Sequence, residues 1–266
     1  MRTKKQKVIA EDSAYDARTV TIHPKTKKIE TVTFLKARKE IQVIDPKVRS
    51  DYETLAKLHM GDISVLNRDD SDKIWIVSYI NDNAPVSYYV FDRKKQKATY
   101  LFSNRTALEK VALGSMQPIS FLARDGLTIY GYLTLPNNQQ SKNLPLVLNV
   151  HGGPQSRDVW GLNPRVQWLA NRGYAVLQVN YRGSIGYGKA YMSAGFREWG
   201  GKMQDDLTDG VKWAIEQGIA DPSKICIFGG SYGGYAALVG ATFTPDLYKC
   251  AVDIVGPSNL ITMIET

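Results

Sequence analysis

Four continuous apolar runs in the second half of the chain constrain the fold more than any other feature of the sequence. They are PLVLNV (145–150), AVLQV (175–179), ICIF (225–228) and CAVDIV (250–255). A strand reads as unbroken apolar sequence when both of its faces are covered. Helical spacing between the runs predicts helices at about Pro164–Asn171, Lys202–Gln217 and Tyr232–Gly240. Alternating strands and helices predict an α/β fold with a mostly parallel sheet.

The first 115 residues follow another pattern, in which short alternating strands are separated by polar turns. The expected strands are Thr19–Ile22, Ile29–Phe34, Glu40–Ile44, Ile74–Tyr79, Ser87–Phe91 and Ala98–Phe102, with one helix at about Asp51–His59. This spacing predicts a β-sandwich, barrel or propeller and leaves the choice open. We therefore expect two domains, a strand-rich segment over residues 1–115 and an α/β segment over residues 116–266. An antiparallel strand pair joined at Asp125-Gly126 opens the second segment.

The net charge of +8 belongs mainly to the first segment. Residues 1–115 hold 22 Lys and Arg against 15 Asp and Glu, whereas residues 116–266 hold 12 against 11. The lysines cluster at turns, without the interleaved aromatic residues of a nucleic-acid surface, so we expect no nucleic-acid partner. No apolar stretch is long enough to cross a bilayer, and no apolar region follows the charged start, so we predict a cytoplasmic location with no membrane contact. The composition does not indicate an oligomeric state.

The sequence gives little support for a metal, a cofactor or redox chemistry. Cys226 and Cys250 both lie in apolar runs, and two cysteines do not make a disulfide framework, so we expect both to be reduced core residues. No His, Cys or Asp cluster has metal-ligand spacing. The glycine-rich turn near residue 230 lacks the lysine of a phosphate-binding loop. Neither a metal nor a cofactor is predicted.

The segment FGGSYGGY (228–235) contains the pattern G-x-S-x-G around Ser231. The bare pattern is weak, since it occurs by chance in roughly one chain in ten of this length. Its position raises its significance, because an apolar strand ends just before it and a helix begins just after it, as a nucleophile elbow requires. Gly229 and Gly233 would remove side chains that collide around the exposed serine. We therefore predict that Ser231 is a nucleophile and that Tyr232 offers its backbone N–H to an oxyanion.

A second oxyanion donor is expected in the loop after an earlier strand. His151-Gly152-Gly153-Pro154 follows PLVLNV directly. Its two glycines let the backbone approach a substrate carbonyl, and Pro154 fixes the turn. We predict that Gly152 and Gly153 line the oxyanion hole, although a Gly-Gly-Pro turn can also simply end a strand.

These segments together resemble the prolyl oligopeptidase family of serine peptidases, in particular its acylaminoacyl-peptidase-like branch. The resemblance is carried by HGGPQSRDVW, LANRGYAVLQVNYRGSIGYG, EWGGKMQDDL, GGSYGGYAAL and VDIVGPSNL, from about Pro118 to the last residue. It implies the N-terminal part of an α/β-hydrolase domain, preceded by strands that resemble the last blades of a β-propeller. It also implies that Ser231 is the nucleophile, that the backbone N–H groups of Tyr232 and Gly153 form the oxyanion hole, and that the substrate is a short or N-acylated peptide.

The expected triad order is Ser, then Asp or Glu, then His, but the histidines stand at 23, 59 and 151, all before Ser231. His151 belongs to the oxyanion loop, where a structural role is expected, and Asp253 is a weak candidate for the acid. The chain therefore reads as a fragment of a longer enzyme, catalytically incomplete on its own, or as a degenerate member retained for another purpose. A carboxylesterase of the same fold and a non-catalytic interaction module remain alternatives.

Overall fold

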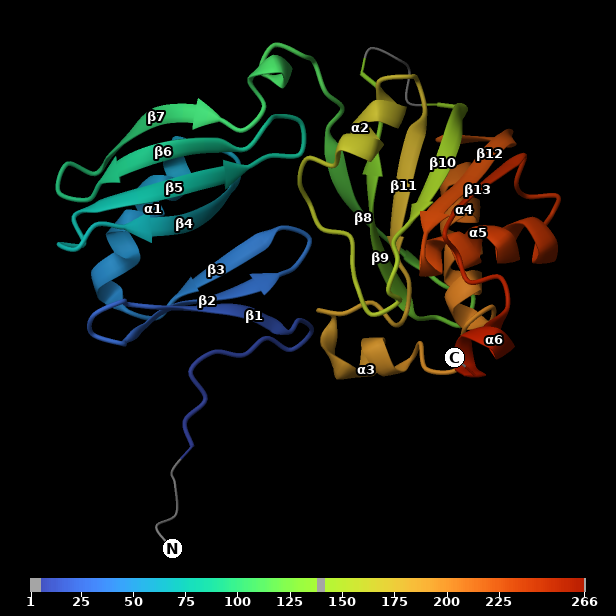
Figure 1. Ribbon diagram of the computed structural model, residues 1–266, viewed down its shortest axis with the longest axis horizontal. Helices are drawn as coiled ribbons and strands as arrows, with labels where there is room; N and C mark the ends of the chain where they lie inside the picture. The colour runs from blue at the N-terminus through green and yellow to red at the C-terminus, as the bar shows by residue number, and fades with distance from the viewer. Residues whose placement is uncertain (1–5, 138–141, 266) are drawn as a thin grey trace, which may run out of the picture. The chain divides into compact units, whose positions relative to one another are not determined.

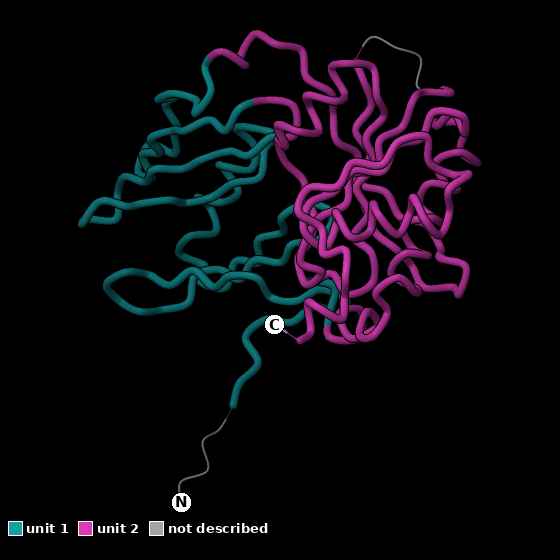
Figure 2. The backbone as a smooth tube through the Cα atoms, turned by 45° about the vertical axis from the view of Figure 1, so that its right-hand side comes forward, with its two compact units in different colours: residues 1–81, 85–106, 186–188 teal, residues 82–84, 107–185, 189–266 magenta. Residues whose placement is uncertain are grey.

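The computed structural model describes residues 6–137 and 142–265, and the chain divides into two compact units (Figure 2). The first unit comprises the residues up to 81 with 85–106 and 186–188, and the second comprises 82–84, 107–185 and the residues from 189 on. The domain boundary expected between residues 115 and 116 stays a prediction, since these units are defined by contacts and exchange short segments.

Unit 1 contains two antiparallel sheets (Figure 1). The first has the order β1-β2-β3, with β1 (Ala17–Ile22), β2 (Ile29–Leu35) and β3 (Lys39–Val43). The second has the order β4-β5-β6-β7, with β4 (Asp62–Arg68), β5 (Ile74–Ile80), β6 (Ser87–Asp92) and β7 (Lys97–Ser103). Between them in sequence lies α1 (Arg49–Leu58), preceded by a short 3₁₀ turn at Pro46–Val48, and a second such turn spans Thr106–Leu108. All six expected strands are present, and only β4 was missed.

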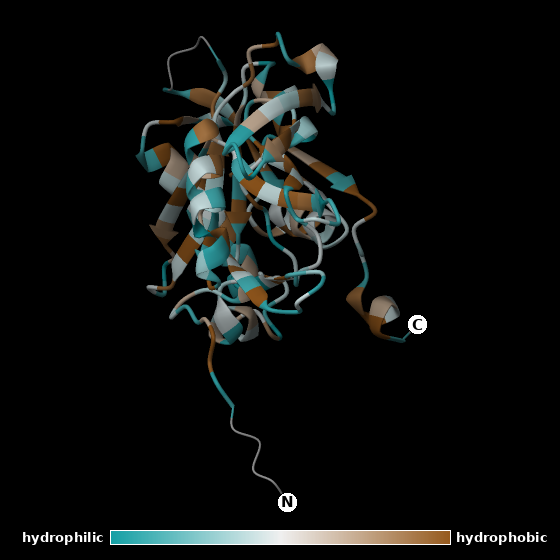
Figure 3. Ribbon diagram, turned by 90° about the vertical axis from the view of Figure 1, so that its left-hand side faces the viewer, coloured by the Kyte–Doolittle hydropathy of each residue, from teal (hydrophilic) through white to brown (hydrophobic). Residues whose placement is uncertain are grey.

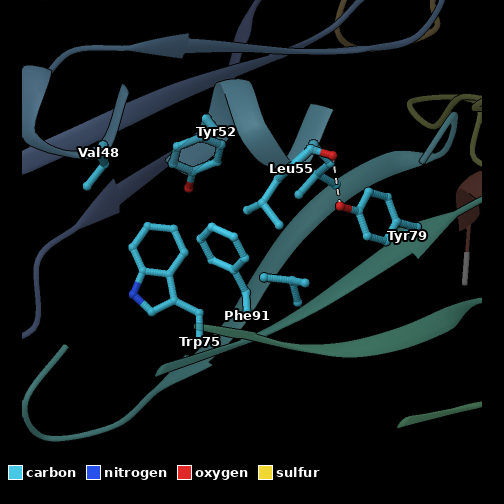
Figure 4. Packing of buried hydrophobic residues seen from close by; sticks show 8 residues of the cluster. Val48, Tyr52, Leu55, Trp75, Tyr79 and Phe91 are labelled. Atoms are coloured by element: carbon cyan, nitrogen blue, oxygen red, sulfur yellow. Dashed lines mark hydrogen bonds between the residues drawn. The ribbon is translucent and has the colours of Figure 1, made fainter. Parts of the chain in front are cut away.

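The core of unit 1 is aromatic (Figure 4). Trp75 and Phe91 are fully buried beneath α1, and the Tyr79 hydroxyl donates a hydrogen bond of 2.8 Å to the Leu55 carbonyl. β4 buries Ile63 in this core and packs half-buried Val65 against it. Its other positions are polar or partly exposed, so its sequence DISVLNR lacks the alternation by which strands are recognised.

Unit 2 is built on a six-stranded sheet with the order β13-β12-β10-β11-β9-β8. Its strands are β8 (Met116–Leu122), β9 (Thr128–Thr134), β10 (Leu144–Val150), β11 (Ala175–Asn180), β12 (Ala220–Gly230) and β13 (Cys250–Ile254). The four strands from β10 to β13 run parallel to one another, and β9 pairs antiparallel with both β8 and β11. The predicted α/β fold with a mostly parallel sheet, preceded by antiparallel strands, is therefore confirmed.

The helices of unit 2 are α2 (Pro164–Ala170), α3 (Gly188–Ser193), α4 (Lys202–Glu216), α5 (Tyr232–Phe243) and α6 (Leu260–Glu265). α4 packs on β11 and β12, and its Met203, Leu207 and Val211, spaced four residues apart on one face of the helix, are fully buried. α5 packs on β10, β12 and β13. α3 and α6 were not predicted. In α6, Ile261 and Ile264 are exposed. Figure 3 shows hydrophobic residues along the ribbon near the C-terminus. Within the described residues, no helix combines the length and apolar character needed to cross a membrane.

A buried ion pair fixes the end of β11 to α4. Arg182, which is 3% exposed, donates from Nε and Nη2 to both carboxylate oxygens of Asp206 at 2.9 and 2.7 Å. The same guanidinium also holds Asp125 in the hairpin between β8 and β9, at 2.7 and 2.9 Å. The hydrogen bonds from Arg182 hold the pKa of the Asp125 carboxyl well below its usual range. Arg182 thus connects the end of β11, α4 and the β8–β9 hairpin as a structural residue.

Removing Asp206 takes away one of the two carboxylates that compensate the buried Arg182 guanidinium, and it leaves the backbone N–H and Nε of Arg182 without their acceptor. We expect Asp206→Ala to lower the free energy of unfolding by about 3–5 kcal/mol, because Asp206 is fully buried and Arg182 keeps its charge. The neighbouring Asp205 pairs with Arg124 at 2.7 Å, with both side chains largely exposed, and Asp205→Ala is expected to cost about 0–1 kcal/mol. Urea denaturation of the two variants measures the difference, and equal losses would contradict a structural role for the pair.

Candidate active site

Ser231 occupies the turn between β12 and α5 and has an unusual backbone conformation. Its φ is 56° and its ψ is −121°, outside the regions that non-glycine residues normally occupy. Its N–H donates a hydrogen bond of 2.9 Å to the Ile254 carbonyl at the end of β13. Such strain persists only where the surrounding structure enforces it, and it often marks functional sites.

Two glycines leave the space that this turn needs. A Cβ on Gly233 would overlap the Val150 carbonyl oxygen at the end of β10, and a Cβ on Gly229 would overlap the backbone of Gly233. The turn therefore lies directly against β10, and no side chain fits at either position. Gly230, between them, could carry a Cβ in ordinary van der Waals contact, since its nearest neighbour would be 3.8 Å away.

The loop 151–154 lies beside Ser231. β10 and β12 are parallel neighbours with Val150 opposite Gly229, so both loops leave the same edge of the sheet. A Cβ on Gly152 would come within 3.0 Å of the Gly230 carbonyl oxygen and 3.3 Å of the Ser231 Cβ. Gly153 has a φ of 129°, which favours glycine. The structure thus brings together the two segments that the sequence singled out.

His151 is held in place by its own neighbours. Its Nδ1 lies 2.8 Å from the Gly152 carbonyl oxygen, and its Nε2 lies 3.1 Å from the Ser184 hydroxyl. The ring stacks on Tyr181 at 4.5 Å, and the Tyr181 hydroxyl donates to the His151 carbonyl at 3.0 Å. Burial lowers the pKa of His151, so the ring is neutral near pH 7. Because a carbonyl oxygen can only accept, we assign the ring proton to Nδ1. Nε2 is then directed at Ser184 Oγ, whose hydroxyl also donates to the Tyr181 carbonyl at 2.7 Å.

The side chain of Tyr232 is buried in an aromatic cluster. Its ring lies 4.7 Å from that of Trp199, 5.2 Å from that of Tyr181 and 5.8 Å from that of Tyr235. Burial raises the pKa of its hydroxyl far above the usual value, and that hydroxyl has no hydrogen-bond partner among the described residues. The side chain therefore anchors the first turn of α5, while the backbone N–H stands at the helix start, where intrahelical acceptors are missing.

A general base for Ser231 is not found among the described residues of unit 2. No hydrogen bond joins Ser231 to His151, the one histidine of this unit. His23 and His59 belong to unit 1. Asp253 is exposed, and its Oδ1 accepts the Gly256 N–H at 2.7 Å in the turn that follows β13. The Asp253 carboxylate is therefore occupied in shaping that turn.

One group of residues in unit 1 has its potential metal ligands close together. Among the described residues, atoms of His23, Glu30 and Asp72 lie within 4.8 Å of one another. Arg68 pairs with Glu30 at 2.7 Å, and Arg93 donates to Asp72 at 2.5 Å. These guanidinium groups already neutralise both carboxylates, so the cluster fits a salt-bridge network better than a cation site. The sequence missed it because its members are far apart in the chain.

Comparisons with known proteins give a consistent picture. A sequence profile of the prolyl oligopeptidase family matches residues 160–266. Dipeptidyl aminopeptidase BIII of Pseudoxanthomonas mexicana is 47% identical over 98% of this chain and 39% of its own length. Dipeptidyl peptidase family member 6 of Caenorhabditis elegans is 38% identical over 92% of this chain and 36% of its own length. The chain thus spans well under half the length of these relatives.

Solved structures support the fold. A puromycin-hydrolyzing peptidase of Mycobacterium tuberculosis matches with a TM-score of 0.76 and 22% identity, over 100% of this chain and 42% of that one. An acylaminoacyl peptidase of Pyrococcus horikoshii matches with a TM-score of 0.69 and 22% identity, over 94% of this chain and 39% of that one. At these identities the likeness concerns the fold alone.

Two glycines of the turn, Gly230 and Gly233, provide a matched test of its packing. We expect Gly233→Ala to destabilise the protein by about 3 kcal/mol, because the new methyl group must displace the backbone of β10. Gly230→Ala is expected to change the free energy of unfolding by no more than about 1 kcal/mol, since its Cβ would make only ordinary van der Waals contacts. Chemical denaturation measures both values. A harmless Gly233→Ala would mean that the turn does not lie against β10.

Proposed function

We propose, from the premise that this chain belongs to the prolyl oligopeptidase family of serine peptidases, that Ser231 is the nucleophile of a peptidase acting on short or N-acylated peptides. In the proposed reaction, the Ser231 hydroxyl oxygen attacks the carbonyl carbon of the scissile bond and forms an acyl-enzyme. Water then takes the acyl group from the serine. The substrate and activity of the whole protein are part of this proposal, because the chain covers 39% of the dipeptidyl aminopeptidase that it resembles.

The observation that carries the proposal is the strained Ser231 turn beside the Gly152-Gly153 loop. Attack on a carbonyl places negative charge on its oxygen, which is stabilised by N–H groups already in position. The Tyr232 N–H at the start of α5 and the Gly153 N–H in the neighbouring loop are the proposed donors. A Cβ added at Gly152 would lie 3.3 Å from the Ser231 Cβ, so the residue next to Gly153 lies beside the serine, which supports this pair of donors.

His151 is proposed to position this loop. Its Nδ1–H donates to the Gly152 carbonyl and its ring stacks on Tyr181, which together restrict the loop backbone next to Gly153. A base for Ser231 would need an accepting nitrogen directed at the serine hydroxyl. The accepting nitrogen of His151 is directed at Ser184 instead.

The relatives suggest the substrate class. Two of them are named for dipeptidyl release, and an acylamino-acid-releasing enzyme of Arabidopsis thaliana is 35% identical over 48% of this chain and 17% of its own length. All three names describe the removal of a short N-terminal unit. We propose the same class here, with dipeptide release as the first reaction to test. A carboxylesterase and a non-catalytic interaction module are the alternatives.

The 266-residue chain alone is expected to show little peptidase activity, because no base for Ser231 is found among the described residues of unit 2. Release of p-nitroaniline from dipeptidyl and acylaminoacyl substrates should exceed the buffer rate by no more than about 10³–10⁴-fold. Ser231→Ala should change this residual rate little. Turnover at about 1–10³ s⁻¹ that is lost in His151→Gln would instead identify His151 as the base.

The whole protein that contains this chain should react with a fluorophosphonate at Ser231, and Ser231→Ala should abolish the labelling. Comparing matched amide and ester substrates on that protein then separates a peptidase from a carboxylesterase, since an esterase would hydrolyse the ester alone. A folded whole protein that is not labelled would support the non-catalytic alternative and contradict the proposal.

A further inference from the structure

The two cysteines of the chain are direct neighbours across the sheet. Cys226 on β12 and Cys250 on β13 are paired residues of adjacent parallel strands. Both are free thiols; Cys226 is half-buried and Cys250 is exposed. The expectation that both are core residues is therefore wrong for Cys250, because β13 is the outermost strand of the described sheet and its residues are mostly exposed.

Their placement suits a covalent bond between them. Adjacent strands lie about 4.7–4.9 Å apart, and disulfides join residues whose Cα atoms are about 4.4–6.8 Å apart. Paired residues of parallel strands also direct their side chains to the same face of the sheet. A disulfide needs a closer approach of the two Cβ atoms than regular pairing gives. Closing the bond therefore requires a small shift of β13 toward β12.

The two thiols differ in accessibility, which gives an order to their reactions. Cys250 is open to solvent and is the thiol that an external reagent reaches first. Burial, together with the neighbouring Cys250, raises the pKa of the Cys226 thiol to about 12. Cys226 is thus a poor nucleophile toward free reagents, but it is held next to any mixed disulfide that a reagent forms with Cys250. Such proximity replaces a bimolecular encounter with a step inside the protein.

We propose that Cys226 and Cys250 form a redox-responsive dithiol site that is oxidised to an intramolecular disulfide by low-molecular-weight disulfides. The Cys250 thiolate attacks one sulfur of the reagent, forms a mixed disulfide and releases the first small thiol. Cys226 then loses its proton and attacks the Cys250 sulfur, releasing the second small thiol. The protein gives up two hydrogens, and the reagent is reduced to two thiols.

The site lies close to the Ser231 turn along the same two strands. β12 runs from Cys226 into Ser231, and β13 runs from Cys250 to Ile254, whose carbonyl accepts the Ser231 N–H at 2.9 Å. The disulfide would therefore tie together the two strands that hold this turn. The inference concerns the thiols alone and does not depend on any catalytic role of Ser231.

The test uses the reduced 266-residue chain incubated with oxidised glutathione under native conditions. We expect both thiols to disappear in a titration with Ellman's reagent, while the intact mass falls by two hydrogens and carries no glutathione. The melting temperature should rise, because the bond constrains the unfolded chain. Reduction with dithiothreitol should restore both thiols.

Single variants provide the control. The Cys226→Ser variant should retain one glutathione as a mixed disulfide on Cys250, since no second thiol is present to displace it. Cys250→Ser should stay largely unmodified, because Cys226 is shielded and protonated. Thermal melting of the reduced variants checks that each still folds. Glutathione retained on Cys250 of the unsubstituted chain, or covalent dimers in place of the internal bond, would overturn the proposal.

Discussion

The packing of the β12–α5 turn against the end of β10 is the constraint on which the rest of the site depends. Because a methyl group at Gly233 would overlap the Val150 carbonyl, the start of α5 can approach the sheet only with glycine there. That approach sets the strained φ of Ser231 and places the serine beside Gly152. The geometry of the site thus follows from backbone contacts before any polar side chain is considered.

Other contacts hold the elements around this turn. The aromatic cluster of Tyr181, Trp199, Tyr232 and Tyr235 joins the loop after β11 to the first turn of α5. The buried pair of Arg182 and Asp206 fixes the same loop to α4. Hydrophobic burial supplies most of the stabilisation in such a domain, while buried polar pairs are costly to break. The region therefore combines an apolar anchor with a polar one.

Much of the fold could be predicted, because parallel strands buried on both faces leave continuous apolar runs. The strand β4 and the short helices α3 and α6 could not, since few or none of their residues are buried and their sequences carry no clear period. In the candidate site, Ser231 and the two glycine-containing loops could be identified from the spacing of residues in the sequence. The orientation of His151 was not, because it depends on Ser184 and Tyr181, which are distant in the sequence.

The sequence by itself determined the class of the sheet, the position of the serine turn and the absence of a histidine after it, because these depend on local composition and order along the chain. Tertiary structure alone decided which distant residues meet. It directed the accepting nitrogen of His151 at Ser184, buried Arg182 against Asp206, and placed Cys226 opposite Cys250. Strand register and loop packing set these contacts, and neither can be read from a linear pattern.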